Sequence, residues 1–206
     1  MTVRPYDAVL CDIDGVLRHW PAPGPADLDH VHGLPAGTIA AAAFAPPRLH
    51  PAITGEVTDE EWRAAVAADL ADACGSTDRA RSIVAAWSAL VPRVDQEVVS
   101  LLTRVREVVA VALVSNATTR LESDLVRQGL HDLADVVVNT SRIGVAKPDP
   151  RVYRIAAERV GAPAHRCLFI DDTSENVVAA REVGMAAVHY RRIEDLEDAL
   201  SALLRT

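Results

Sequence analysis

Near the N-terminus runs the stretch AVLCDIDGVL, residues 8–17, in which apolar residues give way to two aspartates and a glycine. An apolar run followed by a turn signal is typical of a buried strand in a parallel sheet. The carboxyl ends of such strands form the edge of the sheet where α/β proteins bind their ligands. We therefore expect Asp12 and Asp14 at that edge, although the two acids alone also fit a solvated turn.

Further along the chain, short apolar runs that predict strands alternate with helical patterns. These runs lie at residues 108–114, 136–138, 167–170 and 186–189. Between them, Asp95 and Asp149 stand where a helix N-cap is expected, and Gly129 stands where a helix is expected to end. Strands that alternate with helices form a parallel sheet covered on both faces. The predicted fold class is therefore α/β.

Residues 19–94 have a helical pattern with no good strand candidate. The prolines and glycine of residues 20–25 predict a loop, and Pro46-Pro47 predicts the end of a short helix. Thr58 begins a capping box and Ser76 caps the next helix. We expect residues 19–94 to form an α-helical subdomain inserted into a core made of residues 1–18 and 95–206.

The overall composition indicates which partners and which cellular compartment to expect. The net charge of −8, without a basic cluster, argues against nucleic acid as a partner. Three cysteines with no metal-ligand spacing indicate a reducing compartment. An apolar signal region and an apolar run near twenty residues are both missing, so we expect a cytoplasmic protein with no membrane span. A monomer and a homodimer are equally compatible with the sequence.

Polar residues follow the other predicted strands as well. Ser115 and Asn116 follow the second strand, Lys147 lies in a proline-rich stretch, and Asp171-Asp172 follow the fourth strand. Carboxylates at the ends of adjacent strands repel one another unless a cation lies between them, which favours Mg²⁺ with oxygen ligands. With such a cation, one carboxylate can attack phosphorus and a second can transfer protons. The sequence therefore indicates phosphoryl transfer.

Four of these segments together resemble the four motifs of the haloacid dehalogenase superfamily, in the same order and with similar spacing. They are DIDGVL at 12–17, VSN at 114–116, KP at 147–148 and FIDD at 169–172. The resemblance is nearest to phosphatase-type members whose helical cap follows the first motif, such as the N-terminal domain of soluble epoxide hydrolases and phosphoglycolate-phosphatase-like proteins. It implies a Rossmann-like sheet with an inserted helical cap.

The same resemblance implies roles for individual residues. Asp12 would be the nucleophile and Asp14 the general acid and base. Ser115 would hydrogen-bond the phosphoryl group, Asn116 would line the pocket beside it, and Lys147 would bridge nucleophile and phosphate.

For the metal, the resemblance implies the carboxylate of Asp12, the backbone carbonyl of Asp14, and an acid after the fourth strand. By position that acid is Asp172, with Asp171 behind it or bound through water. Asn176 would contact the phosphate near the metal.

The function expected from this set is Mg²⁺-dependent hydrolysis of a small phosphate monoester through a phospho-aspartate. A dehalogenase-like hydrolase is an alternative, but the dehalogenating relatives lack the second aspartate, which here is Asp14. A phosphosugar mutase is disfavoured because residues 19–94 contain few basic residues. A non-catalytic binding domain is disfavoured because all the motif residues are present.

Overall fold

The central feature of the molecule is a five-stranded parallel sheet. The computed structural model describes residues 4–20 and 25–204. Its strand order is β5-β4-β1-β6-β7, and Cys11 of β1 lies opposite Leu113 of β4 and Ile170 of β6. The strands are β1 (Ala8–Cys11), β4 (Ala110–Ser115), β5 (Val136–Asn139), β6 (Cys167–Asp171) and β7 (Ala186–His189). The α/β class predicted from the sequence is confirmed.

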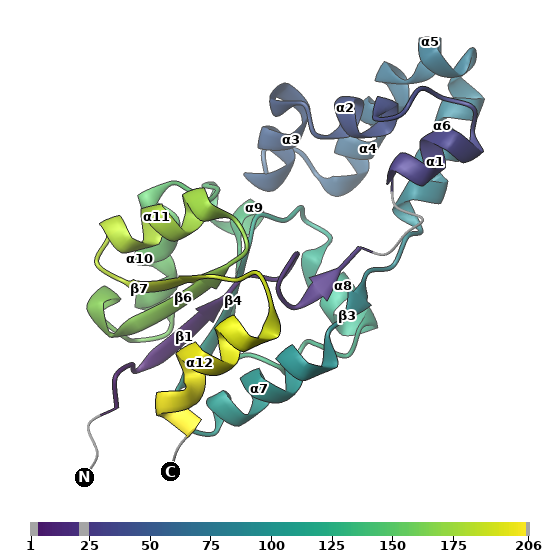
Figure 1. Ribbon diagram of the computed structural model, residues 1–206. Helices are drawn as coiled ribbons and strands as arrows, with labels where there is room; N and C mark the ends of the chain where they lie inside the picture. The colour runs from purple at the N-terminus through teal and green to yellow at the C-terminus, as the bar shows by residue number, and fades with distance from the viewer. Residues whose placement is uncertain (1–3, 21–24, 205–206) are drawn as a thin grey trace.

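Helices cover both faces of the sheet (Figure 1). Side chains alternate along β1, so that Val9 and Cys11 belong to one apolar core and Ala8 and Leu10 to the other. The first core includes α7 (Gln96–Arg106), α8 (Leu121–Arg127) and α12 (Ile193–Leu204). The second includes α10 (Pro150–Arg159) and α11 (Ser174–Glu182). Two single turns, α9 (Thr140–Ile143) and η1 (Ala164–Arg166), complete this part of the chain.

The helix starts predicted at two aspartates are confirmed. The carboxylate of Asp95 accepts hydrogen bonds from the N–H groups of Glu97 and Val98, and that of Asp149 accepts one from Arg151. Each carboxylate thereby satisfies N–H groups that have no partner within the helix. Along residues 4–20 and 25–204, no helix has the length and hydropathy needed to cross a bilayer.

Between β1 and α7, the described residues form six helices that pack around a third apolar core, and we call this group the cap. They are α1 (Pro25–Val31), α2 (Thr38–Ala43), α3 (Pro46–Ile53), α4 (Asp59–Asp69), α5 (Ala71–Cys74) and α6 (Thr77–Ser88). Trp62 and Trp87 are 5% and 8% exposed and belong to this core. The predicted capping box at Thr58 and N-cap at Ser76 are both present.

Between residues 18 and 94 the structure differs from the sequence prediction at three points. Residues 18–19 and 93–94, where no strand was expected, form the short antiparallel strands β2 (Arg18–His19) and β3 (Arg93–Val94). Pro46-Pro47 opens α3 instead of only ending α2, and Pro25 is the first residue of α1, because proline fits the first turn of a helix. The rest of the predicted loop, residues 21–24, lies outside the described residues.

Direct contacts hold the cap over the carboxyl edge of the sheet. The Thr118 hydroxyl donates a hydrogen bond of 2.7 Å to Asp59 of α4, and the Thr119 hydroxyl accepts one of 2.9 Å from the Asp59 N–H. A second contact joins Gly55, between α3 and α4, to Ser141 of α9. A Cβ on Gly55 would lie 2.0 Å from the carbonyl oxygen of Ser141, so the two backbones are in contact. The division into a core of residues 1–18 and 95–206 and a cap of residues 19–94 stays a prediction.

Candidate active site

The strand order brings three of the predicted site segments to one edge. Because β1 lies between β4 and β6, Asp12 follows the central strand, Ser115 ends one neighbour and Asp171 ends the other. The Asp12 N–H donates a hydrogen bond of 2.9 Å to the carbonyl oxygen of Ile170, which continues the pairing one residue beyond β1. The sheet therefore fixes the backbone on which these side chains stand.

A tight loop returns the chain toward this edge immediately after Asp12. The N–H groups of Leu17 and Arg18 both donate to the carbonyl oxygen of Ile13, whose side chain is fully buried. At Gly15 the backbone has φ +92°, and a Cβ there would lie 2.0 Å from Oδ2 of Asp172. Only glycine combines this conformation with such a close approach.

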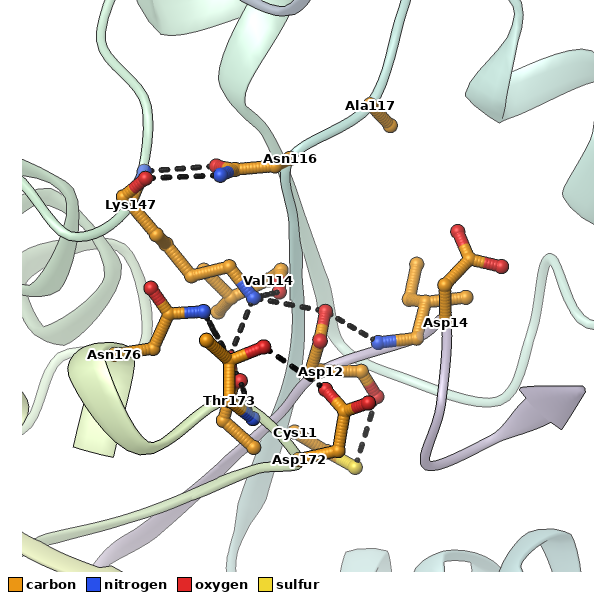
Figure 2. A network of polar contacts seen from close by, with 12 residues as sticks. Cys11, Asp12, Asp14, Val114, Asn116, Ala117, Lys147, Asp172, Thr173 and Asn176 are labelled. Atoms are coloured by element: carbon orange, nitrogen blue, oxygen red, sulfur yellow. Dashed lines mark hydrogen bonds and ion pairs between the residues drawn. The ribbon is translucent and has the colours of Figure 1, made fainter. Parts of the chain in front are cut away.

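Lys147 occupies the centre of the cluster (Figure 2). Its Nζ lies 2.8 Å from Oδ1 of Asp12 and 2.6 Å from Oδ2 of Asp171, and it donates to the carbonyl oxygen of Val114 at 3.1 Å. Burial opposes the charge of this amine, but the two carboxylates outweigh burial and raise its pKa above the usual value. Lys147 is therefore a buried ammonium shared by two acids.

The two oxygens of Asp12 differ in their surroundings. Oδ1 accepts the Ile13 N–H at 2.7 Å as well as Lys147, whereas Oδ2 accepts no hydrogen bond from the described residues. Burial raises the pKa of Asp12 to about 7, while Lys147 opposes that rise and the Asp171 charge adds to it. One oxygen of this carboxylate is thus held and the other is open.

The two acids after β6 have different environments. Asp171 is fully buried, and its carboxylate accepts the Asn176 amide at 3.0 and 3.1 Å and the Thr173 N–H at 2.8 Å. Asp172 is exposed, and partial burial together with the Asp171 charge raises its pKa. Asn176 therefore supports the Asp171 carboxylate, and its expected contact with the phosphate stays a prediction.

The acids of this cluster fit a divalent cation. Asp12, Asp171 and Asp172 each offer an oxygen within 4.8 Å of the others. Carboxylate oxygens are ligands that Mg²⁺ prefers in proteins, and three of them this close together could hold one ion. Three carboxylates face a single ammonium, which leaves a surplus of negative charge for the cation to neutralise. The Asp14 carboxylate is not part of this group.

Ser115 and Asn116 lie side by side but have different partners. The Ser115 side chain is 2% exposed, and its hydroxyl has no hydrogen bond with residues 4–20 or 25–204. The Asn116 amide accepts the Lys147 N–H at 2.7 Å and donates to the Lys147 carbonyl at 2.9 Å. Asn116 thereby positions the backbone that carries the lysine, a link of 31 residues that sequence spacing does not reveal.

Asp14 lies apart from the Asp12–Lys147 pair, and its carboxylate points away from them in Figure 2. It forms a two-pronged ion pair with Arg18, at 2.7 Å to Nε and 3.0 Å to Nη2, and it accepts the Trp20 indole N–H at 3.2 Å. Arg18 was not among the predicted site residues. Its spacing of four residues from Asp14 is the sequence signal that could have indicated it.

A cavity of about 600 Å³ opens between the cap and the sheet edge. Asp14 and Asn116 line it from the core, and Trp62 and Trp87 line it from the cap. The two tryptophans therefore serve both the cap interior and the cavity wall.

A comparison with known proteins identifies the family. The model of the haloacid dehalogenase-like hydrolases matches residues 6–184. The chain belongs to this family. The phosphatase MT3486 from Mycobacterium tuberculosis is 52% identical over 58 residues, which make up 28% of this chain and 27% of that protein. The chain matches less than a third of the length of the first curated relatives.

Solved structures of this family share the fold. A family enzyme from Bacteroides thetaiotaomicron, in complex with magnesium and inorganic phosphate, superimposes with a TM-score of 0.71 at 21% identity, over 90% of this chain and 94% of that one. L-2-haloacid dehalogenase from Xanthobacter autotrophicus, with chloropropionic acid covalently bound, gives a TM-score of 0.62 at 20% identity, over 96% and 83% of the two chains. Phosphate-binding and dehalogenating members thus have this architecture in common.

Proposed function

We propose that this hydrolase cleaves phosphate monoesters of small metabolites, with Mg²⁺ as cofactor and Asp12 as nucleophile. The observation that carries the proposal is the set of contacts made by the two carboxylate oxygens of Asp12. One of its oxygens is fixed by Lys147 and the Ile13 N–H, the other is open, and two further acids lie beside it. A nucleophile held in this way is oriented before the substrate arrives.

In the first step, Oδ2 of Asp12 attacks phosphorus, and the bond from phosphorus to the ester oxygen breaks. Asp14, in its protonated form, gives its proton to the departing oxygen, so that the product leaves as a neutral alcohol. Lys147 and the Ser115 hydroxyl donate hydrogen bonds to the phosphoryl oxygens. For this step Asp14 rotates from Arg18 toward the ester.

In the second step, water attacks the phosphorus of phospho-Asp12. Asp14, now ionised, takes a proton from that water, and the bond from phosphorus to Oδ2 breaks. Inorganic phosphate leaves, Asp12 is restored as a carboxylate, and Asp14 is protonated again. Each residue thus returns to its starting state.

Asp12 and Asp172 are the carboxylates we assign to Mg²⁺, with the Asp14 carbonyl as a further ligand and Asp171 in support. When bound, the ion neutralises charge that develops on the phosphoryl oxygens. The surplus negative charge of the acid cluster and the magnesium and phosphate bound to the Bacteroides enzyme support this assignment.

A halocarbon hydrolase is the second candidate, because the cavity is largely apolar and the Xanthobacter dehalogenase has the same fold. The presence of Asp14 weighs against it, since a departing halide needs no proton. The acid cluster weighs against it as well, because substitution at carbon needs no divalent cation.

The test measures phosphate release from p-nitrophenyl phosphate and halide release from 2-chloropropionate. We expect phosphate release with Mg²⁺ that stops with a chelator and falls at least 1,000-fold, on the order of the loss seen when a nucleophile is removed, in Asp12→Asn. Asp78→Asn, which changes an exposed aspartate of the cap, is the matched control and should retain full activity. Halide release without phosphate release would establish the second candidate instead.

A further inference from the structure

The cavity between cap and core has an apolar wall that is rich in aromatic side chains. Phe44, Trp62 and Trp87 form one aromatic cluster, with ring centroids 5.3 to 6.4 Å apart. Trp20 lines the same cavity, so all three tryptophans of the chain face it. Aromatic rings contribute large apolar contact areas with little conformational freedom to lose.

Exposed apolar surface is concentrated at this cavity. Six large hydrophobic side chains of the described residues are exposed, and three of them line the cavity: Trp20, Phe44 and Val91, at 50%, 46% and 67%. Apolar side chains left open to water around a hollow indicate a ligand that covers them.

The charged groups of the lining are engaged with one another. Arg18 pairs with Asp14. In the same lining, Arg120 and Arg127 share Asp124, which leaves one formal positive charge in excess. Each of these three arginines is therefore already paired with an aspartate of the same lining.

Arg63, which lines the cavity from the cap, is likewise paired with an aspartate. Its guanidinium donates to Asp59 at 2.6 Å and to the Ser88 hydroxyl, and lies 4.9 Å from the ring centre of Trp87. Binding a second anionic group would require this arrangement to break, at the cost of leaving Asp59, which is 3% exposed, without its partner.

We propose that the cavity is the subsite for the leaving group and that it takes an uncharged, apolar alcohol with an aromatic or branched aliphatic body. The inference rests on the phosphatase function proposed above. Asp14 connects the two, because it lines the cavity and is the group that would protonate the departing oxygen. Sugars and polyols need hydrogen-bond donors and acceptors, and the side chains of Ser88, Asn116 and Thr118 in the lining are already bonded to other residues of the protein. A volume of about 600 Å³ accommodates a bicyclic ring system.

The first experiment compares kcat/KM for four substrates: 1-naphthyl phosphate, 4-carboxyphenyl phosphate, glucose 6-phosphate and acetyl phosphate. Acetyl phosphate, with its small leaving group, reports the core chemistry alone. We expect 1-naphthyl phosphate to exceed glucose 6-phosphate by roughly 100-fold, from the apolar area covered. A preference for glucose 6-phosphate or for the carboxylate-bearing ester, with acetyl phosphate hydrolysed, would overturn the substrate class and leave the phosphatase function standing. Failure on all four would overturn the function.

Matched variants locate the effect in the cavity. Phe44→Ala should lower the ratio of kcat/KM for 1-naphthyl phosphate to that for acetyl phosphate roughly tenfold, and Val91→Ala roughly threefold, in proportion to the apolar area lost. Val31→Ala is the control, because Val31 is an equally exposed valine, at 69%, that does not line the cavity. An equal effect of Val31→Ala and Val91→Ala would contradict the assignment.

Tryptophan fluorescence gives a readout that is independent of catalysis. Because every tryptophan lines the cavity, its emission reports occupancy there. We expect 4-nitrobenzyl alcohol to quench this emission saturably and Phe44→Ala to weaken that binding roughly tenfold, again from the lost apolar contact. Quenching that does not saturate, or that is unchanged in Phe44→Ala, would overturn the subsite whether or not the protein hydrolyses phosphate esters.

Discussion

The Lys147 ammonium lies 2.6 Å from Oδ2 of Asp171, and both side chains are almost completely inaccessible to water. The same ammonium contacts Asp12, so that one positive charge holds two buried acids in place. Buried charges of this kind are stable only while each has its partner.

Replacing this lysine should therefore destabilise the fold. In Lys147→Met, Asp12 and Asp171 face each other without a counter-ion, and we expect a loss of about 3–5 kcal/mol in the free energy of unfolding. Mg²⁺ should restore part of that loss by neutralising the acids. Urea unfolding with and without Mg²⁺ measures both effects. The double variant Lys147→Met/Asp171→Asn should regain stability, and equal stability of the wild type and the single variant would refute the pairing.

Removal of the second aspartate should slow turnover without unfolding the protein. Asp14→Asn removes the proton donor and acceptor, and we expect kcat to fall by about 100- to 10,000-fold. With p-nitrophenyl phosphate, whose leaving group needs little protonation, a burst of nitrophenol should precede slow turnover.

The control for this variant is Asp69→Asn. Asp69 forms the same two-pronged pair, with Arg48 on the cap, and its side chain is 36% exposed, as is that of Asp14. Loss of an arginine pair alone should leave kcat unchanged. An equal fall in both variants would refute a catalytic role for Asp14.

Gly15 should affect metal activation more than stability. Gly15→Ala places a Cβ against Asp172, and we expect the Mg²⁺ concentration for half-maximal activity to rise at least roughly tenfold, as for other groups that orient metal ligands. Gly184→Ala is the control: its φ is +91°, and a Cβ there meets nothing within 4 Å. Both variants should lose about 1–2 kcal/mol of stability from the left-handed backbone, while only the first should alter the Mg²⁺ titration.

The N-cap of α10 predicts a dependence of stability on pH. Hydrogen bonds from Arg151 lower the pKa of Asp149 to about 2, below its unfolded value near 4. The ionised carboxylate therefore stabilises the fold above about pH 4, and this contribution is lost as the pH falls through about 2.

Asp149→Ala should cost about 1 kcal/mol at pH 7, and the difference from the wild type should shrink as the pH falls below 4. Asp149→Asn, which can still cap the helix but does not titrate, is the control. Chemical unfolding across this pH range measures the effect. A constant difference between the alanine variant and the wild type would contradict it.

The sheet and the positions of the motif residues are predictable from local sequence. A buried strand needs only its apolar run, and the N-caps at Asp95 and Asp149 need only their own side chains. The rule that parallel strands present their carboxyl ends at one edge then places Asp12, Ser115 and Asp171 together.

Contacts between distant segments are not predictable in this way. The pairing of Asp59 with Thr118, which docks the cap, and that of Asn116 with the Lys147 backbone depend on how separate elements pack. Pro46-Pro47, which were expected to end a helix, also open the next one, because proline fits the first turn of a helix.

The amino-acid composition contains one indication of the importance of Lys147. The chain contains twenty arginines and a single lysine, Lys147. A chain that uses arginine for every other positive charge uses lysine where a compact ammonium fits between two buried acids.

The most direct test of the account is the detection of phosphate bonded to Asp12. Asp14→Asn, mixed with a phosphate ester and Mg²⁺ and quenched in acid, should carry close to one phosphate per chain, mapped by mass spectrometry to Asp12. Asp12→Asn/Asp14→Asn should carry none. Turnover by the wild type with no phosphate on Asp12 in the Asp14→Asn variant, or with phosphate on another residue, would contradict the account.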